Sequence, residues 1–359
     1  MRYRYSKDAD KKLIRSAQIW TVEEHKIILS EVDPLAVYIC DKLSREGFET
    51  YIVGGAVRDL LLKKHPKDFD IASAATPSRI KKIFSNSRII GKRFRLVHIF
   101  FGDKIFEIAT FRSAKDGATG NTFGRIEEDV LRRDFTMNAL FYDPRKELVI
   151  DFVGGFHDIN RKRIKSLIPM KIIFEEDPVR MVRAVKYAVI SEFKIPFFLR
   201  KKIKESASLL NKISSSRLTE EMIKIIKSPC AAKIIEELEF LDLYIHFQPA
   251  AVALIKNSLQ FRQRYYKTLS GLNRNDVHDC GKKNSSILSL GLSALVRDYI
   301  DDNIDWETAG EDNYKQMFAL ARKFVLPMNP PRIELGKAIH DIFAEHNINV
   351  KRWRCLDRL

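Results

Sequence analysis

The stretch that most constrains the fold is residues 54–70, which read GGAVRDLLLKKHPKDFD. The apolar run TYIV precedes it, so the pattern predicts a short strand, a glycine turn and then a helix. Gly54 and Gly55 let the backbone approach a ligand, and the first turn of a helix offers N–H groups to a phosphate. Arg58 lies in that turn, where its guanidinium would grip the phosphate. A plain turn is the alternative interpretation.

Two aspartates close this stretch. Asp68 and Asp70 are separated by one residue in DFDIA. Alternation along a strand places both carboxylates on one face, where they repel each other unless a cation lies between them. Mg²⁺ suits such oxygen ligands together with a phosphate substrate. A solvated pair is the alternative, but the glycine turn, the arginine and the carboxylates together favour nucleotidyl transfer.

A third acid lies in a predicted β-hairpin. The β-prone runs 94–101 and 104–112 are separated only by Gly102 and Asp103, which predicts a tight turn. Glu107 is central in the second run, among apolar residues. It is either a solvent-facing position on a half-buried strand or a third metal carboxylate beside the aspartates. We favour the second interpretation.

Arginines and an aspartate adjoin one another further along. Residues 126–143 open with acids and continue at helical spacing, with Arg132, Arg133 and Asp134 in succession. A salt-bridged helix face is the simpler interpretation. In the functional one, Asp134 accepts a hydrogen bond from a ribose hydroxyl while an arginine contacts phosphate.

A similar combination opens the second half of the chain. Asp177 precedes a proline, and Arg180 and Arg183 share one face of the predicted helix. The simpler interpretation is an N-capped helix with a basic edge. The functional one is base recognition, because a carboxylate accepts from an exocyclic amine and arginine donates to ring acceptors. Adenine and cytosine carry that amine, whereas uracil does not.

Composition limits the partners. The formal net charge of +16 over 359 residues indicates a polyanion, for which nucleic acid is the simplest choice and an anionic membrane surface the rival. No apolar run approaches the ~20 residues that span a bilayer, and the first residues lack the apolar core of a secretion signal. We therefore expect a cytoplasmic protein without a membrane partner. The four scattered cysteines argue against a structural zinc site or a disulfide framework.

The pattern of apolar residues predicts several parts. We expect a flexible basic arm over residues 1–23 and a catalytic head over 24–160, in which residues 23–48 form a helix ending near Gly47. Helical patterns dominate afterwards, as a neck over 161–249 that binds nucleotide and RNA and a body over 250–359 that binds RNA. The basic stretches 200–204, 261–267 and 351–354 are candidate contacts for single-stranded RNA, and solvated helix faces are the alternative.

The motifs GGAVRD, KDFDIA, EIATFR, RRDFTMNAL and EEDPVRMVRAVKYA occur in this order. The series resembles the class II branch of the polymerase-β-like nucleotidyltransferases, which contains bacterial poly(A) polymerases and CCA-adding tRNA nucleotidyltransferases. The likeness runs from about residue 23 to 248. The stretch IIGKRFRLVHI, residues 89–99, and EEHKI near the start look like the poly(A) polymerase group. The fold implied is α+β, with a small mixed sheet in the head and helical neck and body domains.

The resemblance also implies roles for individual residues. Two Mg²⁺ ions would be held by Asp68 and Asp70, with Glu107 as the third carboxylate. The triphosphate would be held by Gly54, Gly55 and Arg58. The ribose and phosphates would be held by Arg132, Arg133 and Asp134, and Asp134 would also assist the carboxylate site. The base would be met by Asp177, Arg180 and Arg183.

The activity implied is template-independent addition of AMP from ATP to RNA 3′ ends, with release of pyrophosphate. The alternative is a CCA-adding enzyme that acts on tRNA. Two other classes stay open: a catalytically silent RNA-binding protein that keeps the fold, and a nucleotidyltransferase acting on a small molecule. The expected partner is single-stranded RNA, with tRNA as a candidate, and we expect a monomer.

Overall fold

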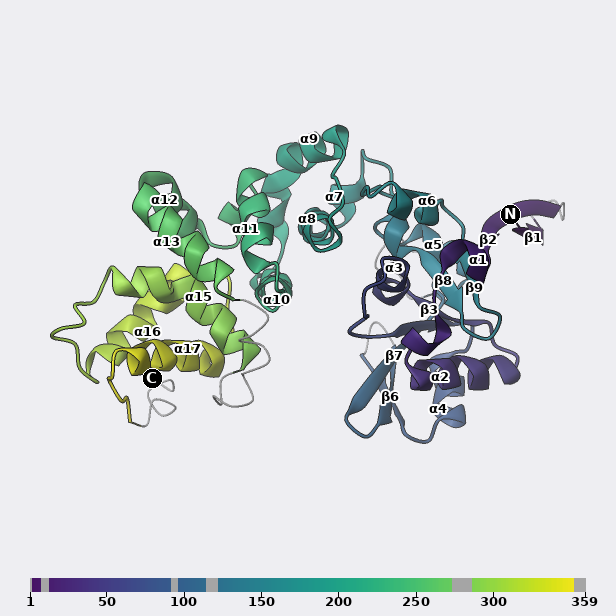
Figure 1. Ribbon diagram of the computed structural model, residues 1–359, viewed down its shortest axis with the longest axis horizontal. Coiled ribbons are helices and arrows are strands. Elements are labelled where there is room, and N and C mark those ends of the chain that lie inside the picture. The colour runs from purple at the N-terminus through teal and green to yellow at the C-terminus, as the bar shows by residue number, and fades with distance from the viewer. Residues whose placement is uncertain (1, 8–12, 92–95, 114–121, 273–285, 352–359) are drawn as a thin grey trace. The chain divides into compact units, whose positions relative to one another are not determined.

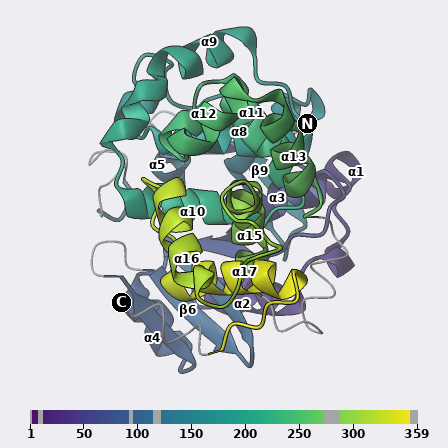
Figure 2. The same ribbon diagram turned by 90° about the vertical axis from the view of Figure 1, so that its left-hand side faces the viewer.

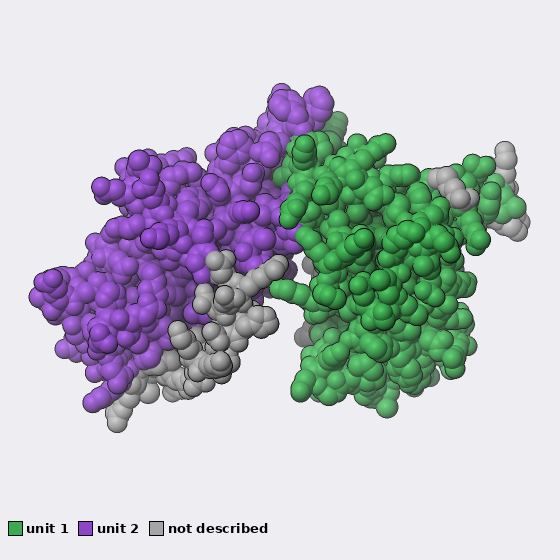
Figure 3. Space-filling model, viewed as in Figure 1, with its two compact units in different colours: residues 1–177, 191–196 green, residues 178–190, 197–359 purple. Residues whose placement is uncertain are grey.

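The computed structural model describes residues 2–7, 13–91, 96–113, 122–272 and 286–351. The chain divides into two compact units (Figure 3). Unit 1 comprises residues 1–177 and 191–196, and unit 2 comprises residues 178–190 and 197–359. This division falls later than the head–neck boundary predicted at residue 160, and it has no counterpart to the boundary predicted at residue 249.

Unit 1 is built on a mixed sheet (Figure 1). Its nine described strands follow the order β1-β2-β9-β8-β3-β4-β7-β6-β5. β4 and β7 are parallel, and the other neighbours are antiparallel. The strands are β1 Arg2–Lys7, β2 Leu13–Trp20, β3 Thr50–Val53, β4 Asp70–Ser73, β5 Ser87–Ile90, β6 Leu96–Phe101, β7 Lys104–Thr110, β8 Leu140–Asp143 and β9 Leu148–Asp151. The α+β class is thus confirmed, with a larger sheet than predicted.

Helices complete unit 1, among them α3, which follows β3 directly. They are α1 Val22–His25, α2 Pro34–Arg45, α3 Gly55–Leu61, α4 Pro77–Ile83, α5 Ile126–Leu131, α6 Gly155–Asn160 and α7 Ile173–Glu176. The core at the centre of the sheet is aromatic: the rings of Tyr51, Phe111 and Phe141 contact one another with centroids 5.9–6.4 Å apart. β3, all four residues of which are buried, ties this core to the glycine turn.

The sequence prediction for the first 48 residues was wrong in two places. Residues 2–7 and 13–20 form a β-hairpin rather than a loose arm, because β2 pairs with β9 and Trp20 stacks on Phe156 at 4.2 Å. The single helix predicted over residues 23–48 is interrupted. Lys26 adopts a left-handed conformation with φ 57° and ends α1, and α2 begins afresh at Pro34, capped by the Asp33 side chain.

The predicted hairpin around Gly102 and Asp103 is confirmed. β6 and β7 pair with Phe101 opposite Lys104, and Gly102 has a φ of +58°, which glycine accommodates without strain. Residues 92–95, in the stretch that looks like the poly(A) polymerase group, lie outside the described residues.

The described part of unit 2 is helical, as the sequence predicts. α15 packs against α13, α16 and α17 (Figure 2). The helices are α8 Val179–Ser191, whose last residue belongs to unit 1, α9 Phe197–Ser206, α10 Ser215–Ile226, α11 Ala231–Phe240, α12 Pro249–Asn257, α13 Leu259–Ser270, α15 Ile287–Asp301, α16 Asn313–Phe324 and α17 Arg332–Glu345. None of the helices in the described ranges is long and apolar enough to cross a membrane.

Candidate active site

Two of the three predicted carboxylates lie on neighbouring strands, Asp70 at the start of β4 and Glu107 within β7. Asp70 is the first residue of β4, and it pairs with Val53, the last residue of β3. The glycine turn, which begins at Gly54 directly after Val53, therefore lies next to Asp70. β4 and β7 run parallel with Ile71 opposite Ile108. The residues that precede this pair are Asp70 and Glu107, so the parallel register sets the two acids side by side.

The electrostatics of Asp70 show the consequence of this crowding. Desolvation by the surrounding protein, followed by repulsion from Glu107 and Asp68, raises the pKa of Asp70 to about 6. Arg133 opposes the shift. The Asp70 side chain still reaches solvent, so neighbouring charges act on a group that a ligand can approach. Glu107 also lies opposite His98, with Oε2 3.5 Å from the ring Nε2.

The donor chemistry of these acids fits a divalent cation. A cation between the acids would reverse the repulsion that raises the pKa of Asp70. Within the described ranges, however, no three His, Cys, Asp or Glu residues lie close enough together to hold a metal ion as they stand. The ligand roles of Asp68, Asp70 and Glu107 therefore stay a prediction.

The glycine turn adjoins two arginines. Gly54 has a φ of +70°, a conformation that side chains other than glycine rarely adopt, and α3 begins at Gly55. A Cβ atom at Gly54 would lie 3.8 Å from Nη1 of Arg133, and one at Gly55 would lie 3.5 Å from Nη2 of Arg58. The fold thus brings together the turn, Arg58 and Arg133, and the contacts of these residues with a nucleotide stay a prediction.

Asn138, which the sequence analysis did not single out, holds both arginines. Nη1 of Arg58 donates to its side-chain oxygen at 3.0 Å, and Nη1 of Arg133 donates to its backbone oxygen at 3.1 Å. Asp59 accepts from Arg58 at 2.8 Å, and Asp129 accepts from Arg133 at 3.0 Å. The signal available in the sequence was the position of Asn138 within the same RRDFTMNAL motif.

Asp134 is hydrogen-bonded to Asn138, the residue that holds both arginines. It is buried, and its Oδ1 accepts from the Phe135 N–H at 2.8 Å and from the Asn138 amide at 3.2 Å. These bonds hold Asn138 in place, and the ribose contact of Asp134 stays a prediction. Arg132 donates to the Ser113 carbonyl at 2.8 Å.

The helix predicted over residues 126–143 was too long. α5 ends at Leu131, because the chain turns to carry Asp134 inward and then enters β8 at Leu140. Arg133 forms an ion pair with Asp129 four residues earlier, at 3.0 Å, but it lies beyond the end of α5 and so is not part of a helix face.

The predicted base-binding residues lie where the chain passes between the units. Asp177 ends unit 1, directly after α7, and Arg180 and Arg183 lie on α8 in unit 2. Arg183 donates to the Tyr187 hydroxyl at 3.1 Å, one turn further along α8. Since the structure describes each unit by itself, base recognition by these residues stays a prediction.

Two of the basic stretches predicted to contact RNA differ in the structure of unit 2. In α9, Arg200 and Lys204 lie over the exposed ring of Phe240, at 5.4 and 4.6 Å. Phe197 and Phe198 at the start of α9 are 72% and 78% exposed. This α9 patch therefore has both aromatic rings and cations at the surface.

The stretch 261–267 is instead structural. Phe261 and Tyr265 are buried, because α13 turns them into the core, and Arg262 and Arg264 form ion pairs with Glu239 and Asp302. The prediction that these aromatic rings contact RNA was wrong. Residues 352–354 of the third stretch lie outside the described residues.

Taken together, the fold and the site define the head of a nucleotidyltransferase. Residues 50–165 match the family described as the poly A polymerase head domain, and residues 192–254 match the one described as a probable RNA and SrmB-binding site of polymerase A. The chain belongs to the class II nucleotidyltransferases.

Curated relatives of both kinds are similar to the chain. Poly(A) polymerase I of Salmonella typhi is 40% identical over 243 residues, which cover 63% of this chain and 52% of the relative. The CCA-adding enzyme of Lactobacillus delbrueckii subsp. bulgaricus is 37% identical over 205 residues, covering 55% and 52%. The chain spans about half the length of these relatives.

A solved structure supports the fold over most of the chain. The Bacillus stearothermophilus CCA-adding enzyme, determined in complex with CTP, has a TM-score of 0.59 and 28% identity. The match covers 88% of this chain and 83% of that one.

Proposed function

We propose that this chain transfers AMP from ATP to the 3′-hydroxyl of RNA without a template, producing a poly(A) tail. The observation that carries the proposal is the juxtaposition of Asp70 and Glu107 on parallel strands beside the Gly54 turn. A head that matches poly A polymerase heads supports the reaction class. The α9 patch supports an RNA substrate, because exposed rings stack on bases while cations meet phosphates.

In the reaction, the RNA 3′-oxygen bonds to the α-phosphorus of ATP, the bond from that phosphorus to the β-phosphate bridging oxygen breaks, and pyrophosphate leaves. The hydroxyl proton passes to water. Two Mg²⁺ ions held by Asp68, Asp70 and Glu107 would supply activation of the hydroxyl and charge stabilisation. The residues of the chain position the RNA 3′-hydroxyl and the triphosphate for this reaction.

The positioning follows from the network around Asn138. Backbone N–H groups at Gly54 and Gly55 and the guanidiniums of Arg58 and Arg133 face the triphosphate. Hydrogen bonds to Asn138 hold both arginines, so little side-chain freedom is lost when the substrate binds. Arg58 and Arg133 thereby contribute fixed positive charge where pyrophosphate departs.

The proposal also specifies ATP as the nucleotide that is transferred. Asp177, Arg180 and Arg183 are the residues proposed to meet the base. The stretch IIGKRFRLVHI, residues 89–99, supports ATP as the substrate. A second support is that Poly(A) polymerase I sequences align over more of this chain than the CCA-adding sequence does, 63% against 55%. The second candidate is CCA addition to tRNA, which the match to CCA-adding structures favours.

One assay separates these candidates. Purified protein is incubated with Mg²⁺, each nucleoside triphosphate and either a generic RNA or a tRNA that lacks its CCA end. Long A tails on the generic RNA are expected. Addition that consumes CTP and stops after CCA on tRNA would replace the proposal with the second candidate. RNA binding without nucleotide transfer would assign the chain to the silent class.

A further inference from the structure

We propose that unit 1 carries a second RNA-binding surface, a groove that leads from the β1–β2 hairpin past the β9–α6 turn to residues 161–165. We call it the hairpin groove. The inference rests on the proposed RNA substrate and adds a path for single-stranded RNA upstream of the reacting end. The hairpin lies outside both matched family regions, residues 50–165 and 192–254.

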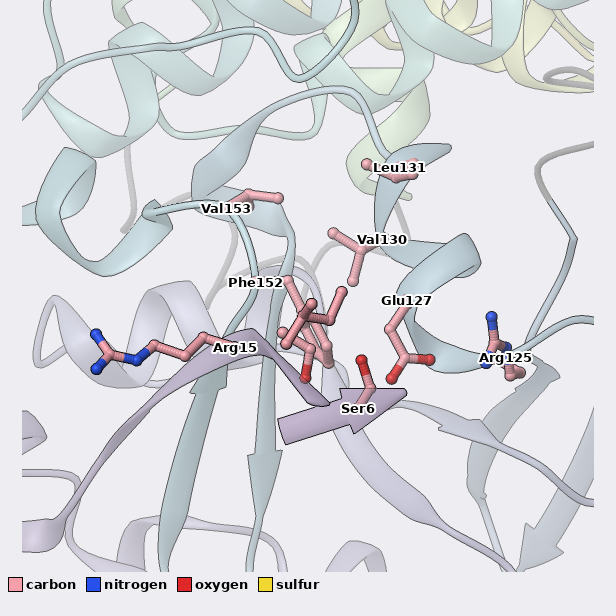
Figure 4. Close-up of a pocket in the computed structure, with 10 residues that line it drawn as sticks. Ser6, Arg15, Arg125, Glu127, Val130, Leu131, Phe152 and Val153 are labelled. Carbon is pink, nitrogen blue, oxygen red and sulfur yellow. The ribbon is translucent and has the colours of Figure 1, made fainter. Parts of the chain in front are cut away.

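The groove begins at a cavity of about 650 Å³ between the hairpin and α5 (Figure 4). This volume lies in the range of pockets that hold small organic ligands, which is room enough for an unstacked base. Val130 and Phe152 supply apolar walls, and Arg15 and Arg125 lie on opposite sides (Figure 4). The apolar interior can therefore hold a base, and the two arginines can contact the phosphates on either side of it.

Two smaller cavities continue the path. One of about 230 Å³ shares Arg15, Ser16 and Phe152 with the first. The other, of about 250 Å³, shares Gly154 and His157 with that one. Shared lining residues place the three cavities next to one another along one path. It ends at three basic residues, Arg161, Arg163 and Lys165.

The charges of the groove favour a polyanion. Arg15, Arg125, Arg161 and Lys165 are exposed, and none of them forms an ion pair with another residue of the described ranges. Unpaired cations gathered along one groove attract phosphates and release counterions when RNA binds.

The acids that line the groove are already engaged. Asp151 accepts from four consecutive backbone N–H groups, those of residues 153–156. Asp158 accepts from Arg163 at 2.6 Å and from the Thr136 hydroxyl at 2.8 Å. Glu127 lies 3.8 Å from Arg4. These partners weaken the repulsion that the acids would exert on a phosphate.

Aromatic rings along the groove favour unpaired bases. The guanidinium of Arg15 lies 4.6 Å from the Tyr3 ring centroid, and Phe152 and His157 follow along the path. Bases can stack on such surfaces only when they are free of a duplex, so single-stranded RNA fits better than a helix.

The hairpin is held in place for this role. Arg4 donates to Glu49 at 3.1 Å and to the Tyr51 hydroxyl at 3.3 Å, and it lies 5.9 Å from the Phe152 ring centroid. Three strand spacings of ~4.8 Å separate β9 from β4, or ~14 Å across the sheet. An RNA must therefore extend several nucleotides from its 3′ end to fill both sites.

The test uses the full chain with Arg15→Ala, Arg161→Ala and Lys165→Ala combined. A matched control removes three exposed cations at the other end of the sheet, Arg79, Lys82 and Arg88. Affinity is measured by fluorescence anisotropy with RNAs of about 6 and about 20 nucleotides, lengths that bracket a single-strand binding site. A variant with Arg15→Lys and Arg161→Lys, in which Lys165 is unchanged, keeps the charge and should bind RNA as the unaltered chain does.

We expect the groove variant to bind the longer RNA about tenfold more weakly, with a log–log salt slope shallower by about 2, since ~0.7 is lost per phosphate contact. Affinity for the short RNA and nucleotide transfer to it should be unchanged. Equal losses for the groove and control variants, or for both lengths, would overturn the inference while transfer to the short RNA still supports the proposed function. Unchanged RNA binding with lost binding to anionic vesicles would assign the groove to a lipid surface and overturn it too.

Discussion

Arg58 and Asn138 are 80 residues apart in the sequence, and a buried hydrogen bond of 3.0 Å joins them. Through its backbone oxygen Asn138 also holds Arg133, so one side chain and one carbonyl fix the two arginines beside the glycine turn. Substrate-binding groups that are held in advance lose less freedom on binding. The network therefore links the packing of the head to the proposed triphosphate site.

Replacing Asn138 with alanine should weaken triphosphate binding. The change leaves Arg58 without its amide acceptor, and we expect the KM for ATP to rise about tenfold. Loss of a buried hydrogen bond costs about 1–3 kcal/mol of unfolding free energy. Steady-state kinetics and denaturant unfolding measure both effects. The double variant Asn138→Asp with Asp134→Asn keeps both the acceptor for Arg58 and a hydrogen bond between positions 134 and 138, and it is the control: if it raises KM as much as alanine does, the positioning role is wrong.

Asp70→Asn should abolish nucleotide transfer and raise stability near pH 7 in the absence of divalent metal. Because the folded protein raises the pKa of Asp70 to about 6, the ionised carboxylate destabilises the fold, and this cost appears as pH rises through the folded pKa. Below the unfolded pKa both proteins carry a neutral group, so the stability difference should vanish. Thermal melts in EDTA at pH 3.5 and 7.5 test this. Full activity in the variant would refute the assignment of Asp70.

Affinity for Mg²⁺ should fall as pH drops through about 6, since a protonated Asp70 cannot serve as a ligand. Titration calorimetry with Mg²⁺ over pH 5–8 measures the dependence. Glu107→Gln removes one of the repulsive neighbours, so the midpoint should move to lower pH while overall affinity weakens. A midpoint that does not move would show that Glu107 does not act on Asp70.

Gly54→Ala should impair both folding and ATP binding. A residue with a Cβ atom at this φ of +70° and ψ of −129° costs about 1–3 kcal/mol. At this turn the new atom also comes within 3.8 Å of Arg133. Gly47→Ala is the matched control, because Gly47 has a φ of +86° with nothing within 4 Å of its would-be Cβ. Both variants should lose similar stability in chemical denaturation, and only Gly54→Ala should raise the KM for ATP.

Local patterns accounted for much of the fold. The TYIV run, the glycine pair and the Gly102–Asp103 turn predict β3, the start of α3 and the β6–β7 hairpin, because each depends on neighbours within a few residues. The same reasoning failed where contacts with residues far away in the sequence determine the local structure. The polar composition of residues 1–23 does not reveal that β2 finds β9, and the spacing of residues 126–143 does not reveal that Asp134 must turn inward.

For the candidate site too, some features could be predicted from the sequence and others only from the tertiary structure. Motif order by itself determined the chemistry to be expected: paired aspartates after a glycine turn, a third acid, and arginines in a fixed series. The sequence also favoured a position for Glu107 beside the aspartates, and the parallel register of β4 and β7 agrees. Tertiary structure alone decided that Asn138 holds Arg58 and Arg133, and that Phe261 and Tyr265 face the core. The physical reason is that side-chain identity is local, whereas strand order and burial depend on contacts between segments far apart in the chain.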